Sequence, residues 1–364
     1  MLLQTEQPDC CQDFDHVSNF IDGIFEYAAS PNKRPFNIED FKEHFGEAGA
    51  WFIKLSKSDK GPVRKGLLGL FSVSPFEVSI LRKVFENDLT FHTSLDDQDF
   101  CFQVQCLPEK LLEILKDFIE PFYTQIFCQS SFKHITGLQN NGLNREIYLK
   151  YYKEKNQDRY QVCPVCLGDV QGYEETFIAQ NEHYFPKQKY PSLGFSQHNL
   201  IPVCSDCNSP TIHGSKDPIA AHGPGAISNV FLPYYRTAMD SVITKFTKIL
   251  GGFQVNICAV NQNDLILVER VNNLNRIYQL EKRWTARVST HFDDVFARLK
   301  AHRENVESTE QDDVKRWLIQ FLKSEEKWTR ERRYNTADAF LQANFYKYLY
   351  EEYIDHLFAQ LHII

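Results

Sequence analysis

Hydrophobic residues along the chain recur more often at helical than at strand spacing. The clearest example is "LPEKLLEILKDFIEPF" at 107–122, where apolar residues such as Leu111 and Leu115 repeat every three or four positions. Pro108 suits the first turn of a helix, and Pro121 should end or kink it. We therefore expect an amphipathic helix here that packs one face into a core.

Two more apolar stripes at helical spacing lie near the C-terminal end. Stripes of large side chains at this spacing are typical of packed helices rather than of ligand sites. The charged stretch "ENVESTEQDD" (304–313) between them should be a solvated connection. The first stripe consists of Ile277, Leu280, Trp284, Val288, Val295 and Leu299, and the second of Tyr346, Tyr350, Tyr353, Leu357 and Leu361.

A few segments predict strands instead. "FCFQVQCL" (100–107) alternates between apolar and polar residues, and "VNICAV" (255–260) with "LILVERV" (265–271) resembles a strand pair joined by a polar turn. Together these patterns predict an α+β fold in three parts. They are an N-terminal α+β domain at 1–150, a loop-rich core at 151–222 and a mainly helical C-terminal region at 223–364.

Composition supports a folded chain. Its 364 residues can form two or three domains, and 43% of them are hydrophobic. No apolar run approaches the roughly 18 residues that cross a bilayer. The start, "MLLQTEQPDCCQDFDH", lacks the basic and apolar regions of a secretory signal. We therefore expect a cytoplasmic protein without membrane contact, whose cysteines stay reduced.

The net charge of −8 is a weak argument against a nucleic-acid partner. However, residues 276–333 contain 14 Lys+Arg against 11 Asp+Glu, and binding requires a local field rather than a positive total. Arg276, Arg283 and Arg287 lie near one face of the expected helix. They are either a strip that binds a phosphate backbone or solvated charges that cover a core.

Four of the ten cysteines form two C-x2-C pairs, "CPVC" and "CSDC". Four thiolates satisfy tetrahedral Zn²⁺ and leave no open coordination position. The surrounding residues 151–222 are too polar to fold on a hydrophobic core alone, which also favours a metal. We expect a structural zinc site at Cys163, Cys166, Cys204 and Cys207. Chance pairs and redox motifs are the alternatives.

Further residues between and after these pairs complete a motif. Glu182-His183, Pro186, Asn199-Leu200 and Cys207-Asn208 follow Cys163-x-x-Cys166 in this order. The combination resembles the HNH, or ββα-metal, endonucleases and covers roughly a sixth of the chain. More narrowly, "EHYFPKQKYP", "HNLIPVCSDCN" and the later "NNLNRIYQLEKRW" resemble defence-associated HNH proteins of Septu and retron systems.

The resemblance implies catalytic roles. His183 would be the general base, and Glu182 would bind Mg²⁺ or Mn²⁺. A neutral imidazole suits this task because its ordinary pKa lies near neutrality. Asn199 would hold the loop that presents the histidine, through its amide donor and acceptor. Asn208 would be an oxygen ligand at the start of a helix after the second cysteine pair, with a helix N-cap as its alternative role.

The sequence departs from the family after Asn208. Relatives often have a lysine a few residues later, whereas here "SPTIH" precedes "GSKDP". His213 is therefore a rival metal ligand, and it would favour Mn²⁺ or another transition ion. Lys216, with Lys187 and Lys189, is a candidate phosphate contact.

The leading hypothesis is a metal-dependent HNH endonuclease with a nucleic-acid partner, DNA before RNA. The family context implies an effector of bacterial antiviral defence that is activated by a partner such as an ATPase or a reverse transcriptase. Residues 1–150 would then be a regulatory or partner-binding domain. The competing hypothesis is a non-catalytic zinc-knuckle module that binds nucleic acid or a partner protein. It explains the cysteines but not the residues that accompany them.

Overall fold

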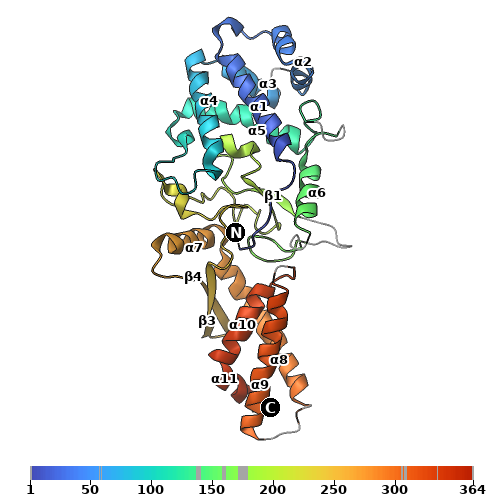
Figure 1. Ribbon diagram of the computed structural model, residues 1–364, viewed down its shortest axis with the longest axis vertical. Helices are drawn as coiled ribbons and strands as arrows, with labels where there is room; N and C mark the ends of the chain where they lie inside the picture. Colours follow the sequence, from blue (N-terminus) through green and yellow to red (C-terminus); the bar gives the residue numbers. More distant parts are fainter. Residues whose placement is uncertain are drawn as a thin grey trace.

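The computed structural model describes residues 2–56, 58, 60–136, 141–157, 161–170, 179–304, 306, 310–333 and 335–362. The molecule is elongated, with N-terminal helices at one end, the cysteine-rich region in the middle and C-terminal helices at the other end (Figure 1). It is of the expected α+β type, 56% helical with two small sheets. Helices therefore build most of the framework. None of the described helices has the length and apolar character needed to cross a membrane.

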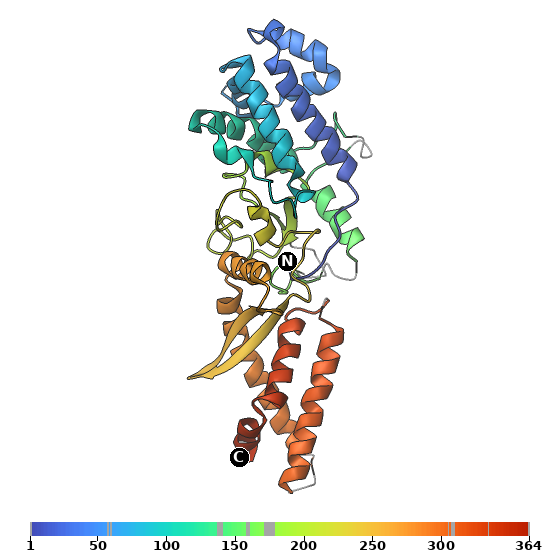
Figure 2. The ribbon, with the colours of Figure 1, turned by 60° about the vertical axis from the view of Figure 1, so that its left-hand side comes forward.

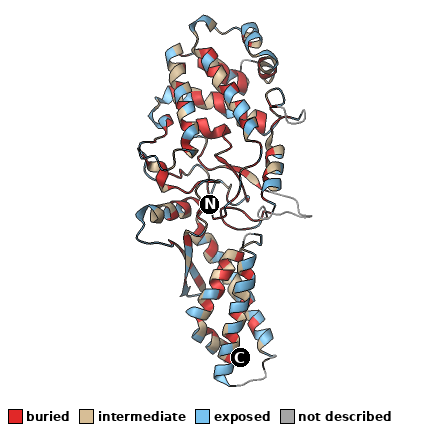
Figure 3. Cartoon of the chain, viewed as in Figure 1, coloured by how far each residue is buried: buried red, intermediate tan, exposed pale blue. Residues whose placement is uncertain are grey.

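Among its described residues, the N-terminal part forms six α-helices, whose buried faces meet in its interior (Figure 3). The predicted helix at 107–122 is confirmed, because its apolar stripe is buried. Pro121 ends this helix, and a π-helical segment, η4 (Phe122–Phe127), continues the chain. The helices are α1 (Cys11–Ala29), α2 (Ile38–Lys54), α3 (Pro62–Phe71), α4 (Pro75–Leu89), α5 (Glu109–Pro121) and α6 (Arg145–Lys155).

The predicted strand at 100–107 is wrong. The segment contains a short 3-10 helix, η3 (Gln103–Cys106), because the buried Asp88 carboxylate accepts hydrogen bonds from the backbone N–H groups of Gln103 (2.8 Å) and Val104 (3.2 Å). These bonds fix a turn that a strand cannot make. The described residues before 150 contain no strand, so this part is helical rather than α+β.

The middle part is built on a short antiparallel hairpin. Strand β1 (Gln180–His183) pairs with β2 (Leu200–Val203) so that His183 lies opposite Leu200. Between them, the chain makes a 3-10 turn, η6 (Pro191–Phe195), which packs against α5. The hairpin therefore lies directly beneath the N-terminal helices.

The helix expected after the second cysteine pair is absent, because residues 205–215 form a series of turns. The Ser209 hydroxyl accepts a hydrogen bond from the Ile212 N–H (3.3 Å), and the Ser209 backbone carbonyl accepts one from the Gly214 N–H (3.2 Å). Gly214 has φ +54°, and a Cβ there would lie 2.4 Å from the Pro210 carbonyl oxygen. These local hydrogen bonds and the left-handed conformation of Gly214 therefore stabilise turns at 205–215 in place of a helix.

In the C-terminal part, the described residues form a second hairpin and five α-helices. Strand β3 (Val242–Ile249) pairs with β4 (Gly252–Ala259), so the predicted partner of "VNICAV" was wrong. "LILVERV" begins α7 instead, because the Asp264 side chain caps it by accepting from the Leu267 N–H (3.0 Å). The helices are α7 (Leu265–Tyr278), α8 (Leu280–Arg303), α9 (Gln311–Glu331), α10 (Ala339–Glu351) and α11 (Ile354–His362).

Both predicted C-terminal stripes are buried in large part. The first is confirmed, since Trp284 and its neighbours in the stripe face the core from α8. The second spans two helices, because the chain leaves helical geometry at 352–353 between α10 and α11. The expected connection at 304–313 is shorter than predicted, because α9 begins at Gln311. Residues 305 and 307–309 of that connection lie outside the described residues.

Contacts cross both expected domain boundaries. The Phe14 ring of α1 stacks on Phe195 with centroids 4.9 Å apart. The Leu3 N–H donates to the Pro164 carbonyl (2.9 Å) in the first cysteine pair, and the Asp338 N–H donates to the Leu167 carbonyl (2.8 Å). The N-terminal and C-terminal parts therefore both hold the cysteine-rich middle.

A candidate metal centre and an adjoining polar cluster

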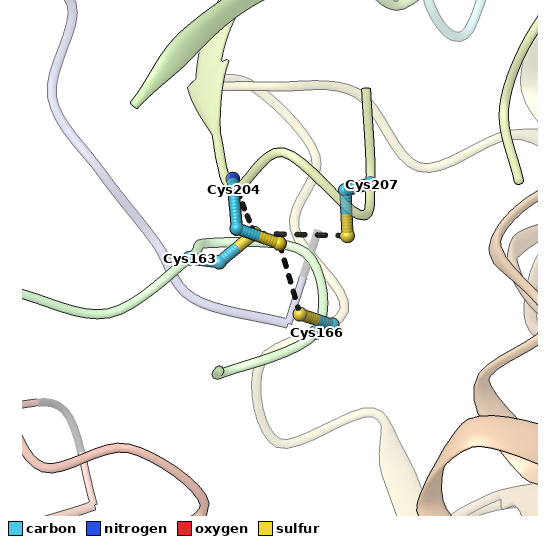
Figure 4. Close-up of side chains that lie close together, drawn as sticks. All are labelled: Cys163, Cys166, Cys204 and Cys207. Atoms are coloured by element: carbon cyan, nitrogen blue, oxygen red, sulfur yellow. Dashed lines mark hydrogen bonds between the residues drawn. The ribbon is translucent and has the colours of Figure 1, made fainter. Parts of the chain in front are cut away.

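The four cysteines predicted as zinc ligands lie together in the middle part (Figure 4). Their Sγ atoms all lie within 4.8 Å of one another, and all four residues are buried. Two of the separations are 3.8 Å, from Cys163 to Cys207, and 3.6 Å, from Cys166 to Cys204. Sulfur ligands about 2.3 Å from a tetrahedral zinc ion lie about 3.8 Å apart. The four side chains therefore fit a metal such as zinc.

Hydrogen-bond donors surround the sulfur atoms. The Cys204 N–H points at Cys163 Sγ and the Gly168 N–H at Cys166 Sγ, each at 3.4 Å. From α8, Arg283 Nη1 donates to Cys207 Sγ at 3.2 Å. Although burial opposes it, the neighbouring Cys207 and Cys166 raise the pKa of Arg283 above its ordinary value. This surrounding compensates the negative charge that four thiolates would carry around one divalent ion.

The three arginines of the expected strip face the protein instead of forming a surface for phosphates. Arg283 contacts the cysteines, and Arg287 Nη1 lies 2.6 Å from the Asp338 carboxylate. Arg276 Nη2 donates to the Asp217 carbonyl at 2.6 Å. Their role is to connect α7 and α8 to the cysteine-rich part.

Glu182 and His213 are in direct contact, although 30 residues separate them in the sequence. The Glu182 carboxylate contacts His213 Nδ1, and both side chains are buried. His213 Nε2 lies 3.1 Å from the Tyr184 carbonyl. Burial raises the pKa of Glu182, and the adjacent imidazole only partly opposes this shift. A cation at this point would favour the charged carboxylate.

Asn208 lies beside Gln180, which the sequence analysis missed. Its Nδ2 donates to the Gln180 side-chain oxygen at 2.6 Å. Gln180 and Glu182 are two positions apart on β1, so their side chains share one face of the strand. The alternation of β1 could have identified Gln180 if the strand boundaries had been known.

His183 is the last residue of β1 and follows Glu182 directly, and His213 lies close enough to influence its pKa. Its Nε2 is 2.9 Å from the Gly194 carbonyl, and the Tyr123 ring packs edge-on with centroids 4.3 Å apart. Burial, together with the neighbouring Lys187 and His213, lowers the pKa of His183 to about 4. The imidazole is therefore neutral at pH 7.

Tyr123 is a second residue that sequence reasoning missed, because it follows Pro121 in a segment that resembles core. A small cavity of about 50 Å³ opens beside it, between α5 and the loop after His183. This space suits one or two water molecules, not a nucleotide. Its lining residues are Lys116, Ile119, Glu120, Tyr123, Lys187, Gln188, Pro191 and Gly194.

Asn199 makes both kinds of backbone contact expected of its amide. Its Oδ1 accepts from the Phe185 N–H (2.7 Å), and its Nδ2 donates to the carbonyls of Phe185 (2.9 Å) and Leu193 (3.0 Å). The side chain is fully buried. It thereby ties the segment after His183 to the 3-10 turn that carries Gly194.

The three candidate phosphate-binding lysines all have partners within the protein. Lys187 Nζ lies 3.3 Å from Glu120 and over the Tyr123 ring, and Lys189 Nζ lies 3.7 Å from the buried Asp217. Lys216 Nζ donates to the Ile277 carbonyl (3.1 Å) and also contacts that of Ile212. Lys216 therefore connects the turns after Cys207 to the end of α7.

Comparison of the chain with protein-family models, curated proteins and solved structures finds no match. The chemistry of this region therefore follows from its own residues. These are a sulfur cage that fits a metal, a buried carboxylate–imidazole contact, and a neutral histidine on the same hairpin.

Proposed function

We propose that this protein is a metal-dependent HNH-type endonuclease that hydrolyses phosphodiester bonds, with DNA as the favoured substrate. The observation that carries the proposal is the contact between Glu182, on the hairpin that also presents His183, and His213, in the turns that follow β2. The cysteine cage would bind zinc and hold this hairpin in place. A zinc module that only binds nucleic acid has no need of the buried acid, the imidazole or the neutral histidine.

Glu182 and His213 would hold the catalytic ion, with the side-chain oxygen of Asn208 as a further donor. An imidazole ligand favours Mn²⁺ over Mg²⁺, because Mg²⁺ prefers oxygen. Such an ion neutralises the charge that develops on phosphate oxygens during hydrolysis.

His183 would accept the proton of the attacking water. It suits this role because it is neutral at pH 7 and because the Gly194 carbonyl fixes its ring. The Tyr123 ring of η4 covers it, so a nucleic acid would displace this ring to reach the imidazole. This cover suits an effector of antiviral defence in the cytoplasm, activated by a partner such as an ATPase or a reverse transcriptase.

Lys187 and Lys189 would contact the phosphate backbone. Their intramolecular ion pairs, with Glu120 and Asp217, are exchangeable because both ammonium groups are partly exposed. Lys216 would position the turn that carries His213, because it binds the carbonyl of Ile212 next to that histidine.

A cleavage assay tests the proposal. Purified zinc-loaded protein is incubated with plasmid DNA and Mn²⁺ or Mg²⁺, with and without EDTA, and the Tyr123→Ala protein is assayed beside it to uncover His183. We expect cleavage that is stronger with Mn²⁺ and that EDTA abolishes. His183→Ala should lose cleavage but keep zinc and fold, whereas exposed His16→Ala should cleave normally. Full activity in His183→Ala, or DNA binding without cleavage by both proteins, would contradict the proposal and leave the non-catalytic module.

A further inference from the structure

Strand β3 has one open edge, and its register shows which backbone groups point there. The Val260 N–H donates to the Ser241 carbonyl (3.0 Å), so these two residues form a hydrogen-bonded pair at the base of the hairpin. Such pairs alternate along an antiparallel ladder. Ile243, two positions after Ser241, lies opposite Cys258 and therefore also belongs to a hydrogen-bonded pair. The same holds for the other odd-numbered residues of β3, which bond to β4. The even-numbered residues therefore direct their N–H and C=O groups outward.

The outward groups belong to Val242, Thr244, Phe246 and Lys248. Within the described part of the chain, β3 pairs with β4 alone, and no other backbone group bonds to these four residues. The Thr244 hydroxyl is also buried without a hydrogen-bond partner among the described residues. An edge of this kind is recognised by another extended chain, because only a strand supplies donors and acceptors at the same repeat.

A groove of about 730 Å³ runs along this edge. Six consecutive residues of β3, Val242–Thr247, form one wall, and Phe340, Asn344 and Tyr348 of α10 line the other. The hairpin projects beside the C-terminal helices, as Figure 2 shows. The groove therefore offers an extended segment of about six residues both an unpaired edge and an aromatic wall.

The charges differ between the two ends of the groove. Val242 shares a smaller cavity with Arg333 and Phe340 at the start of α10, whereas the Phe246 ring lies 5.5 Å from Tyr348 near the end of that helix. The Val242 end carries Arg330, which is paired with Glu326 (2.7 Å), and Arg333, which lies 3.9 Å from Asp240. The opposite end carries Glu351, Glu352 and Lys347. The arginines at the Val242 end are therefore balanced by carboxylates, whereas the opposite end is net acidic.

We propose that β3 binds an extended segment of a partner protein as a third, antiparallel strand. An antiparallel segment ends beside Val242 and begins beside the glutamates at the other end, which favour a basic residue. The partner segment is therefore a strand with a positive first residue. This surface lies on the C-terminal helical part and is independent of the proposed nuclease site.

Binding of synthetic peptides tests this surface. The full-length protein is titrated by fluorescence anisotropy against labelled hexapeptides that alternate Val and Thr, with Lys first and Glu last or in the reverse order. We expect the Lys-first peptide to bind about fivefold more tightly than the reversed one, since the charge of the first residue, beside the glutamates, changes sign. If no peptide of the set binds, or both bind equally, the proposed partner chemistry is wrong.

N-methylation of the peptide tests strand pairing in the unaltered protein. Methyl groups on one alternating set of amides should abolish binding, whereas methyl groups on the other set should leave it unchanged, because only one set faces β3. Equal binding of the two methylated peptides would overturn the proposal.

Substitutions of the protein complete the test. Thr244→Pro removes one outward N–H without touching the ladder to β4 and should weaken peptide binding at least tenfold. Thr244→Ala keeps the N–H and serves as the matched control. If sedimentation shows a dimer of the unaltered protein that Thr244→Pro dissociates, the edge binds a second copy of the chain and the partner segment is wrong.

Discussion

At the scale of single residues, the Asn199 side chain holds the loop between β1 and β2 through hydrogen bonds to its backbone. It is buried and bonds to one backbone N–H and two backbone carbonyls. Asn199→Ala leaves these groups without partners inside the protein, and each unsatisfied buried group costs about 1–3 kcal/mol. We expect the free energy of unfolding, measured in urea, to fall by about 3 kcal/mol.

Asn181 on β1 is the matched control. It is also buried, but neither polar atom of its side chain has a hydrogen-bond partner among the described residues. Asn181→Leu should therefore leave the stability unchanged or raise it. If Asn181→Leu destabilises the protein as much as Asn199→Ala does, the hydrogen bonds of Asn199 are not the source of its importance.

The stacked pair of His92 and His198 makes stability depend on pH. Their ring centroids lie 3.5 Å apart, and the ring planes form an angle of 10°. His92 belongs to the N-terminal part, and His198 directly precedes Asn199. Burial, together with the neighbouring His92, lowers the pKa of His198 to about 3, and burial also lowers the pKa of His92. Tyr235 and Gln7 contact His198, and neither carries a positive or a negative charge at neutral pH.

The pKa of His198 is about 6.5 in the unfolded chain and about 3 in the folded protein. The contribution of the neutral imidazole to folding stability is therefore complete above pH 6.5 and is lost as the pH falls below it. For His198 we expect urea unfolding to show a loss of about 1–2 kcal/mol between pH 7 and pH 5. His198→Gln should remove most of this pH dependence, and exposed His16→Gln should keep it. An unchanged slope in His198→Gln would show that other groups cause the acid sensitivity.

At the scale of elements, α8 supports the cysteine cage through Arg283. Its guanidinium donates to Cys207 Sγ, and its other nitrogen lies 3.7 Å from Asp206. Partners that neutralise or orient metal ligands change metal affinity by about 10–100-fold. We expect Arg283→Ala to weaken zinc binding about tenfold in competition with a chromogenic chelator.

Arg276→Ala is the control for this effect, because Arg276 lies on α7 and bonds to carbonyls rather than to sulfur. Its zinc affinity should equal that of the unaltered protein. Equal weakening by both substitutions would mean that the helices, and not the contact with sulfur, set the affinity.

The elements themselves were predictable where one local signal dominated. The spacing of the two C-x2-C pairs predicted that the four cysteines lie together, and helical periodicity predicted that Trp284 faces the core from a helix. The apolar run after Asp264 was ambiguous, since its periodicity fits a strand as well as a helix, and the N-cap decided for the helix. The predicted strand at 100–107 failed for a different reason, because the deciding bonds come from a distant residue, Asp88.

The contact between Glu182 and His213 was not predicted, although His213 was named as a rival of Asn208 for the same ion. The sequence named both residues as candidates, but their meeting depends on the turns that replace the expected helix after Asn208. Those turns depend in turn on Ser209 and Gly214. Likewise, nothing in the local pattern placed Tyr123 on His183, because their elements belong to different parts of the chain.

At the scale of the whole molecule, the N-terminal helices close over the hairpin that carries His183. One continuous hydrophobic cluster connects them to it, and Phe14 of α1 stacks on Phe195 within this cluster. The contact between the N-terminal helices and this hairpin ends at the Tyr123 ring, beside the ion pair of Lys187 with Glu120. A hydrophobic ring and an exposed ion pair are weaker restraints than the core behind them, so this edge is where the molecule would open.

The last prediction concerns this edge and rests on the proposed nuclease activity. Tyr123→Ala removes the ring that covers His183 but no atom of the proposed catalytic set, so the rate of plasmid cleavage with Mn²⁺ should rise about tenfold if the ring excludes the substrate by about 1.4 kcal/mol. Tyr151→Ala, on α6, is the control and should leave the rate unchanged. A fall in rate for Tyr123→Ala, with zinc content intact, would instead make Tyr123 a positioning residue that holds the imidazole. The ring would then support the reaction that it is predicted here to restrain.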